Sequence, residues 1–329
     1  MPEGCNRTPS HNPVTGKSLR ETALQRTAMT RPQATLIGTT AILLWAALAA
    51  LTVLSQPVPA MLLNALTFGI GGVLGMGWLV ASGSLGKLRG LSWQALAFGT
   101  AGLFGYHALY FSALRLASPV EASLINYLWP LLIVLLSGLL PGERLTRGHI
   151  FGALLGFAGA ALIVLTRAPS ETQPGAALGL LLAFLAAITW AVYSVGSRRL
   201  AAVPTEAVAL YCLGTAVLSA LLHMGFEETH WPKDSTGWIS VVVLGAGPVG
   251  LAFYVWDIGV KRGDIQLLGV ASYGAPLLTT FGLWLTGEVE LTAMVGLAAC
   301  LITIGAVIAA RAGQKLRQGA VAAKEGRVA

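Results

Sequence analysis

Apolar residues along the chain fall into ten long runs, which are separated where proline, glycine or charged residues gather. A helix needs about 20 apolar residues to cross the hydrocarbon core of a bilayer, and each run has roughly that length. The pattern therefore predicts an all-α integral membrane protein with ten transmembrane helices. The predicted spans cover residues 34–54, 60–81, 92–114, 121–140, 148–166, 176–197, 205–224, 238–260, 265–285 and 291–310.

The segments outside these runs are short or polar. Residues 1–33 lack the apolar core of a signal peptide and are predicted to form a disordered cytoplasmic extension. Met29 stands directly before the first run, so we expect that the protein functions without residues 1–28. Residues 311–329 are predicted to be a basic cytoplasmic tail. The connections between the spans leave no room for an extramembrane domain.

The composition agrees with a lipid environment. Hydrophobic residues make up 55% of the 329 residues, charged residues only 11%, and the mean hydropathy is +0.72. A water-soluble domain of this length would expose large apolar patches with such a composition. The 40 glycines suit membrane helices, whose backbones approach closely through small residues.

The basic residues indicate an orientation for the spans. If the N-terminus is cytoplasmic, eighteen of the 21 Lys and Arg residues lie on the cytoplasmic side, and only Arg115, Arg167 and Lys233 lie outside. Basic segments favour the cytoplasmic face of a membrane. We therefore expect both termini to be cytoplasmic, in the inner membrane of a bacterial cell. The net charge of +7 does not indicate nucleic-acid binding, because these residues form no stripe interleaved with aromatic rings.

The second half of the chain repeats features of the first at a shift of about 145 residues. Matched features include a tryptophan in the first helix of each half, a Val-Pro pair before the second, and a Tyr followed by Pro-Leu-Leu in the fourth. With five spans in each half, the two halves must be inverted relative to each other, as in many secondary transporters. We therefore predict two five-helix repeats, residues 34–166 and 176–310.

These residues resemble a known family. The tryptophan of the first helix, the Tyr-Leu-Trp-Pro-Leu-Leu of the fourth and the Gly-Glu-Arg-Leu-Thr at the start of the fifth resemble the EamA branch of the drug/metabolite transporter superfamily. The segment Gly-Tyr-His-Ala-Leu-Tyr-Phe at 105–111 resembles the YddG-type aromatic amino-acid exporters of that branch. The resemblance covers residues 34–310, and it implies ten helices, cytoplasmic termini, a central cavity and outward movement of an amino acid or related metabolite.

Polar-edged rings in the middle of the third and fourth helices are the first candidates for substrate binding. Tyr106 and Tyr110 share a face because they are four residues apart, and His107 lies one position around the helix. Asn126 and Trp129 occupy the fourth helix near mid-membrane. The alternative for the tyrosines is a hydrogen bond to a neighbouring helix, and the alternative for His107 is a purely structural hydrogen bond. If its hydrogen bond is not purely structural, His107 is the one candidate for a group that couples transport to proton movement.

Repeat-related residues extend this set. Trp45 and Trp190 are predicted to line the cavity from opposite sides, with aromatic core packing as the alternative, and Tyr273 is the substrate-binding candidate of the ninth helix. Pro130 and Pro276 are expected to be structural, because proline frees a carbonyl of the preceding turn and bends a helix.

Charged residues are missing from the middle of every predicted span. A phosphorylated substrate would require a buried cation, and a cationic drug would require a buried carboxylate. The expected substrate is therefore a neutral or zwitterionic small molecule with an apolar side chain, such as an aromatic or other neutral amino acid. Glu143 and Glu288 are interpreted as structural, each in the first turn of a helix.

Other classes of protein fit less well. No pair of spans offers paired carboxylates, an activated nucleophile or a metal-ligand cluster, so an enzyme is disfavoured and no metal or cofactor is expected. The expected partners are the lipid bilayer and the substrate, and the protein is expected to be a monomer. An exporter of drugs, dyes or other small metabolites stays open as the alternative function, since cavity volume rather than a motif selects the substrate.

Overall fold

Helices make up the regular structure of the chain. The computed structural model describes residues 29–117, 119–165, 175–285 and 292–325, and no strand occurs among them. The helices of the first half are α2 (Arg31–Ala46), α3 (Leu48–Leu54), α4 (Ala60–Ala81), the short 3-10 helix η1 (Ser84–Leu88), α5 (Trp93–Leu116), α6 (Pro119–Asn126), α7 (Trp129–Ser137) and α8 (Arg147–Leu165). Each predicted span of this half is thus occupied by helix, so the hydropathy pattern places the elements correctly.

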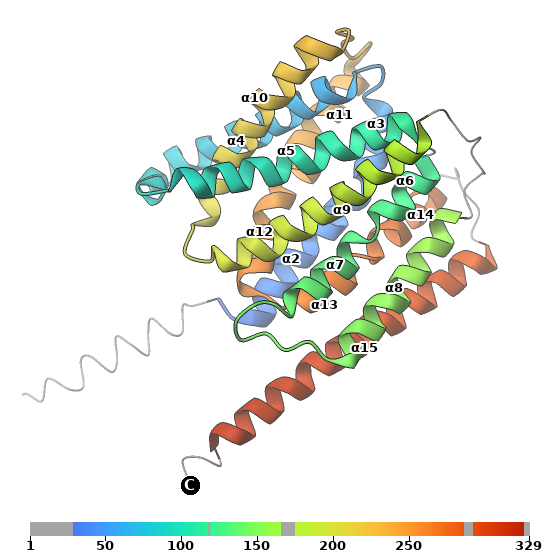
Figure 1. The fold of residues 1–329 in the computed structure, drawn as a ribbon. Coiled ribbons are helices and arrows are strands. Elements are labelled where there is room, and N and C mark those ends of the chain that lie inside the picture. Colours follow the sequence, from blue (N-terminus) through green and yellow to red (C-terminus); the bar gives the residue numbers. More distant parts are fainter. Residues whose placement is uncertain (1–28, 118, 166–174, 286–291, 326–329) are drawn as a thin grey trace, which may run out of the picture. The chain divides into compact units, whose positions relative to one another are not determined.

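The second half is also helical, although its first span is one continuous helix and its third is divided (Figure 1). Its helices are α9 (Ala176–Arg199), η2 (Thr205–Ala207), α10 (Val208–Phe226), α11 (Ser235–Ala246), the π-helix η3 (Gly247–Leu251), α12 (Ala252–Arg262), α13 (Ile265–Ala271), α14 (Gly274–Leu285) and α15 (Ala293–Glu325). The last helix continues fifteen residues beyond the predicted end at residue 310, so most of the predicted tail is helical. The predicted extension is described only from residue 29, and α2 begins at Arg31.

Five helical segments among the described residues are long and apolar enough to cross a membrane, and three shorter apolar segments accompany them. The five are Ala60–Ala81, Ala176–Arg199, Thr205–Phe226, Ser235–Arg262 and Ala293–Leu316. The shorter ones are Ala122–Ser137, Arg147–Leu162 and Ile265–Leu278. Together they fit a multi-pass membrane protein.

Four predicted spans are interrupted rather than continuous. The fourth is divided into α6 and α7, and the ninth into α13 and α14. Pro130 is the second residue of α7 and Pro276 the third of α14. Neither proline has an N–H to bond the carbonyl four residues before it, which explains a break just ahead of each. The first span is divided at Ala47, and the eighth contains η3 with Pro248.

Small residues allow the helices to approach one another closely. α8 and α15 lie side by side (Figure 1), and a Cβ atom on Gly152 would lie 2.5 Å from the carbonyl oxygen of Gly305. Where α2 crosses α12, a Cβ atom on Gly38 would lie 2.8 Å from the Cα of Gly259. Such distances are too short for any side chain, so these glycines are required by the helix packing. Gly148, Gly152, Gly156 and Ala160 form a stripe of small residues at four-residue spacing in α8, a pattern typical of tight helix contact.

The most extensive helix contacts form four pairs. α4 packs on α10, α8 on α15, α5 on α9 and α2 on α12. Each pair joins a helix of the first half to a helix of the second. The core is therefore shared between the halves, and its largest buried cluster includes a group of rings at the place where α2, α7, α9 and α12 meet.

Candidate functional site

Four indole rings from four different helices meet in the centre of the core. Trp45 of α2 has its ring centroid 6.3 Å from Trp129 of α7, 5.7 Å from Trp190 of α9 and 5.1 Å from Trp256 of α12. The ring of Phe253 completes the group at 6.3 Å from Trp45. We call these five residues the central ring cluster. Three of them, Trp45, Trp129 and Trp190, are candidates from the sequence, and the structure brings them together.

The central ring cluster is closed in this structure. Trp129, Trp190 and Trp256 are only 5%, 2% and 0% exposed. Trp129 meets Trp190 and Trp256 edge to face, and Trp190 and Trp256 are stacked with their centroids 6.2 Å apart. These three rings lie in contact with one another, and the cavity that the sequence leads us to expect beside them stays a prediction. Movement of the rings is therefore necessary before a substrate can lie between them.

Polar anchors hold two of the indoles. The Nε1–H of Trp45 donates to the carbonyl oxygen of Pro248 at 3.1 Å, and that of Trp256 donates to the hydroxyl of Ser194 at 3.1 Å. Pro248 belongs to the π-helix η3, where the regular hydrogen-bond pattern is shifted and a carbonyl can serve a side chain. The irregular backbone of the eighth span thus fixes the orientation of a ring contributed by the first.

The predicted face of α5 borders this cluster. The ring of Tyr106 lies 5.1 Å from that of Trp190 and is stacked on Tyr110 at 5.9 Å. The hydroxyl of Tyr110 lies 3.1 Å from that of Ser123, so the hydrogen bond to a neighbouring helix, which the sequence leaves open, is present. The Nδ1 of His107 lies 2.7 Å from the carbonyl oxygen of Leu103 in its own helix. This is a structural hydrogen bond of the kind expected from the alternative reading of His107.

Asn126 adds an amide group beside Tyr106. Its Nδ2 donates to the hydroxyl of Tyr106 at 3.2 Å. The side-chain oxygen is buried and has no hydrogen-bond partner among the described residues. Buried polar atoms are nearly always paired, so a lone buried acceptor beside a ring cluster is a candidate contact for an N–H or ammonium donor.

Tyr273 lies elsewhere. It is fully buried against Phe157, with ring centroids 6.2 Å apart, in a separate cluster between α8 and α15. The prediction of a place in the central site is therefore wrong for Tyr273. The ring of Tyr273 instead fills the space left by Gly156, which has no side chain. A Cβ atom on Gly156 would lie 2.5 Å from this ring.

Glu143 has a different role from the predicted one. It precedes α8, which begins at Arg147, so it is not in the first turn of that helix. Its carboxylate accepts hydrogen bonds from Arg31 at 3.1 Å and from Arg198. Arg198 also donates to the carbonyl oxygens of Val260 and Gly263, both at 2.9 Å. Glu288, the other predicted helix-opening glutamate, lies outside the described residues.

Together with Asp264, whose carboxylate lies 3.8 Å from Arg31, these groups form an ion-pair cluster. We call Arg31, Glu143, Arg198 and Asp264 the end cluster. It ties the start of α2 to the α7–α8 connection, the end of α9 and the α12–α13 connection. The side chain of Glu143 is 8% exposed and that of Arg198 17%, so solvent screens this cluster less than a surface pair.

A second ion pair lies closer to the rings. Asp257 directly follows Trp256, is 1% exposed, and accepts hydrogen bonds from Lys261 at 2.9 Å and from Thr205 at 2.7 Å. Its charge is balanced by Lys261, so the centre gains no net charge from it. Among the described residues, no group of three His, Cys, Asp or Glu side chains is placed to hold a metal ion.

Phe253 and Trp256 are not among the candidates from the sequence. Both lie inside the predicted eighth span, but Phe253 has no polar edge and Trp256 lies near the end of the span, so the criterion that selected the rings of the third helix does not select them. Trp256 is also the repeat counterpart of Phe111, at the shift of about 145 residues. By contrast, Trp78, Trp93, Trp231 and Trp238 are 73%, 74%, 52% and 44% exposed, as expected for rings near helix ends.

Comparisons with known proteins agree on one family. The model of the EamA-like transporter family matches residues 33–165 and again residues 177–311. The chain is 53% identical over 283 residues to the aromatic amino acid exporter YddG of Ancylobacter novellus, covering 85% of this chain and 98% of that protein. It is 26% identical to the aromatic amino acid exporter YddG of Salmonella typhimurium, covering 77% of this chain and 88% of that protein. A solved crystal structure with 52% sequence identity superposes with a TM-score of 0.81 and covers 85% of this chain and 98% of that one.

Proposed function

Because the chain belongs to the EamA-like transporter family, we propose that it exports aromatic and other neutral amino acids through the central ring cluster. Membership of this family makes the protein a multi-pass membrane transporter rather than an enzyme. The proposal concerns the identity of the substrate, its path through the protein and the direction of transport. We also propose that the protein acts as a monomer, since a single chain supplies all the rings of the site.

The central ring cluster is the observation that carries this proposal. Its indole and phenyl rings offer faces and edges to an apolar or aromatic side chain, and ring faces also attract an ammonium group. The buried oxygen of Asn126 adds an acceptor for that ammonium, and the hydroxyl of Tyr106 adds a polar contact. The carboxylate of Asp257, which directly follows Trp256 of the cluster, is already paired with Lys261. These features favour a zwitterion with a large neutral side chain over a cationic dye.

We further propose ten membrane spans in two inverted five-helix repeats, residues 34–166 and 176–310. In this repeat α2 corresponds to α9, α4 to α10, α5 to α12 and α8 to α15. The pairs α4–α10 and α8–α15 each join two corresponding helices, and the pair α5–α9 corresponds to the pair α12–α2. The four main helix pairs therefore support this symmetry. The repeat-related residues Trp45 and Trp190 lie 5.7 Å apart. Residues related by a two-fold axis can meet only beside that axis, so the central ring cluster would lie at the interface of the repeats, the usual place for a transporter site.

The proposed orientation has both termini in the cytoplasm. The excess of basic residues in the corresponding connections supports it. In this orientation the end cluster of Arg31, Glu143, Arg198 and Asp264 lies at the cytoplasmic end of the bundle. Alternating access would then require that this cluster separates to admit the substrate, while the interrupted helices around the rings accommodate the change.

Transport by purified protein in proteoliposomes tests the proposal. We expect counterflow of tryptophan and phenylalanine, weaker counterflow of lysine and glutamate, and little movement of a cationic dye. Trp129→Ala should lower transport several-fold at unchanged expression, and Trp93→Ala is the matched control because Trp93 is 74% exposed. A preference for the dye would overturn the choice of substrate, and equal rates for the two variants would remove Trp129 from the site.

A further inference from the structure

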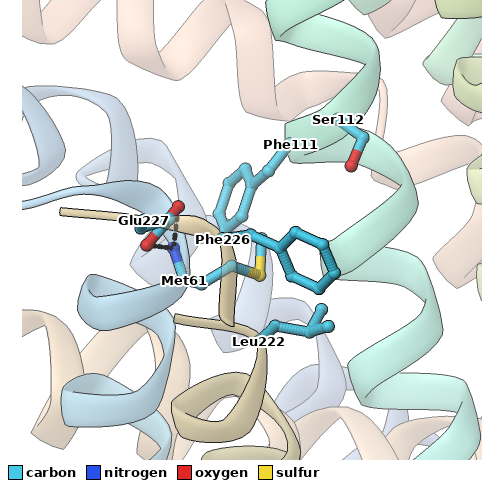
Figure 2. Close-up of a pocket in the computed structure, with 6 residues that line it drawn as sticks. All are labelled: Met61, Phe111, Ser112, Leu222, Phe226 and Glu227. Atoms are coloured by element: carbon cyan, nitrogen blue, oxygen red, sulfur yellow. Dashed lines mark hydrogen bonds between the residues drawn. The ribbon is translucent and has the colours of Figure 1, made fainter. Parts of the chain in front are cut away.

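A pocket lies at the end of α5, away from the central ring cluster. Its volume is about 250 Å³. Figure 2 shows side chains from three parts of the chain converging on it. They are Met61 from the start of α4, Phe111 and Ser112 from α5, Leu222 and Phe226 from the end of α10, and Glu227 directly after it. In the proposed orientation, the start of α4 and the end of α10 face the outside, so this is an outer pocket.

A continuous row of rings joins the outer pocket to the central ring cluster. The ring centroid of Phe111 lies 5.9 Å from that of His107, and His107 lies 5.9 Å from Phe253. Phe253 in turn lies 5.8 Å from Trp190. Phe111 is one helical turn beyond His107 on α5, so the pocket begins where the predicted binding face of that helix ends. His107, Phe253 and Trp190 are only 7%, 3% and 2% exposed, so a substrate ring can follow this row only when these side chains move apart.

The chemistry of the pocket wall suits one end of an amino acid. Met61, Phe111, Leu222 and Phe226 are apolar, and the hydroxyl of Ser112 and the carboxylate of Glu227 are the polar groups. Both polar groups can accept a hydrogen bond, and no Lys or Arg is among the described residues that line the pocket. The apolar wall therefore suits the side chain of an amino acid, while a carboxylate finds no cation there and is directed towards water.

Glu227 is a built part of this wall rather than a mobile surface group. Its side chain is 3% exposed. It accepts hydrogen bonds from the backbone N–H groups of Met61 at 3.0 Å and Leu62 at 3.2 Å, and it lies 3.0 Å from Nδ1 of His223. These contacts hold a negative charge at the N-terminus of α4, where the helix dipole stabilises it. The carboxylate thus keeps a fixed position beside the apolar walls.

We propose that the outer pocket is a second substrate site, an exit station that holds the aromatic side chain of an amino acid between the central ring cluster and the outer surface. This inference rests on the proposed export of amino acids. The pocket is smaller than the roughly 300 Å³ at which sites for whole drug-sized ligands begin, so it fits a side chain rather than a complete large molecule. Phe226, at 81% exposed, lies at the rim, where its movement can release the ring.

Protection of an introduced cysteine tests this site directly. In the full chain with Cys5, Cys212 and Cys300 replaced, Ser112→Cys is reacted with a hydrophilic maleimide in detergent micelles, with and without saturating L-tryptophan or L-alanine. Glu228→Cys is the control, since its side chain is 93% exposed in the same outer segment. We expect tryptophan to slow the labelling of Ser112→Cys several-fold, while alanine has no effect and Glu228→Cys is unchanged. Equal protection by alanine, or none by tryptophan, would overturn the proposal.

A filled pocket gives an independent result if Ser112→Cys reacts too slowly to measure. Leu222→Trp places a ring in the pocket, and Leu221→Trp places the same ring on a neighbouring position that is 55% exposed. We expect Leu222→Trp to lower tryptophan counterflow roughly fivefold to tenfold, the equivalent of one aromatic contact, and Leu221→Trp to leave it unchanged. Wild-type rates in Leu222→Trp, or an equal loss in both variants, would overturn the proposal, because the pocket would then hold no substrate side chain during transport. Absence of amino-acid counterflow in the wild type would instead refute the proposed function.

Discussion

Removal of the charge on Glu143 should favour opening of the cytoplasmic end. Glu143→Gln keeps the size of the side chain but leaves the guanidinium groups of Arg31 and Arg198 without their shared carboxylate. The remaining contacts of Arg198, to the carbonyl oxygens of Val260 and Gly263, are hydrogen bonds without an opposing charge. The substitution therefore weakens the closed arrangement at a residue that joins α2 to α9.

The magnitude follows from the burial of the groups. Two unit charges about 4 Å apart attract by about 4 kcal/mol at an effective dielectric constant of about 20, and the cost of desolvation offsets part of this. A hydrogen bond to a charged group has a net value of about 1.5–3 kcal/mol. The side chain of Arg31 is 34% exposed, so we discount its share and assign the loss mainly to Arg198, which is 17% exposed. A change of about 1.5–3 kcal/mol shifts the opening equilibrium about tenfold to a hundredfold.

Cysteine accessibility measures this shift. Ser197 directly precedes Arg198 and is 4% exposed, so Ser197→Cys should react with a maleimide only when the cytoplasmic end opens. In inside-out vesicles we expect labelling to be at least about tenfold faster when Glu143→Gln is added, in line with the shift estimated above. Glu206→Gln is the matched control, because it removes a single ion pair with Lys87 whose side chains are 25% and 56% exposed, and such pairs contribute little.

Unchanged labelling in the Glu143→Gln variant would refute the reasoning, provided that the variant is expressed and monodisperse. Equal acceleration by Glu206→Gln would also refute it, since the effect would then come from surface charge in general. Export should fall in Glu143→Gln alone, because a bundle that stays open to the cytoplasm returns the substrate to the side from which it came.

Three further predictions concern packing and coupling. Gly152→Ala should lower the free energy of unfolding in detergent by about 1–3 kcal/mol, because the methyl group has no space between α8 and α15, whereas Gly296→Ala should be neutral because open space surrounds it. Asp257→Asn should cost about 3–5 kcal/mol by leaving the buried charge of Lys261 without an opposing charge, and the double change Asp257→Leu with Lys261→Met should recover most of that loss in a thermal unfolding experiment. A pH gradient imposed on proteoliposomes should leave the rate of tryptophan counterflow unchanged, because His107 is bonded within its own helix; a dependence that Gln at position 107 abolishes would show proton coupling instead.

Much of the architecture is predictable because hydropathy is a local property of the chain. A helix in lipid must satisfy its backbone internally, so a run of about 20 apolar residues specifies a helix almost without regard to its neighbours. The helix Ala60–Ala81 begins and ends at the predicted residues, and α8 begins one residue before its prediction. The glycine stripe of α8 likewise predicts a close helix contact before its partner is known.

The site is only partly predictable, since it depends on which helix faces which. The repeat identifies Trp45 and Trp190 as counterparts, and they meet, but the same reasoning places Tyr273 in the centre, where it does not lie. Rotation of a helix by one residue turns a side chain by about 100°, and no pattern within a uniformly apolar span fixes that rotation. Trp256 joins the rings only because α12 packs on α2 in this register.

By itself, the sequence determines a helical membrane protein with two similar halves. The length of each apolar run, its hydropathy and the repeated motifs can all be evaluated from the order of the residues alone. Only the tertiary structure decides that Glu143 is shared by two arginines rather than capping a helix, that four indoles close the centre, and that Phe111 lines a pocket at the end of a row of rings. These features join residues more than fifty positions apart. Their positions follow from helix crossings and broken spans, which depend on the packing of the whole bundle.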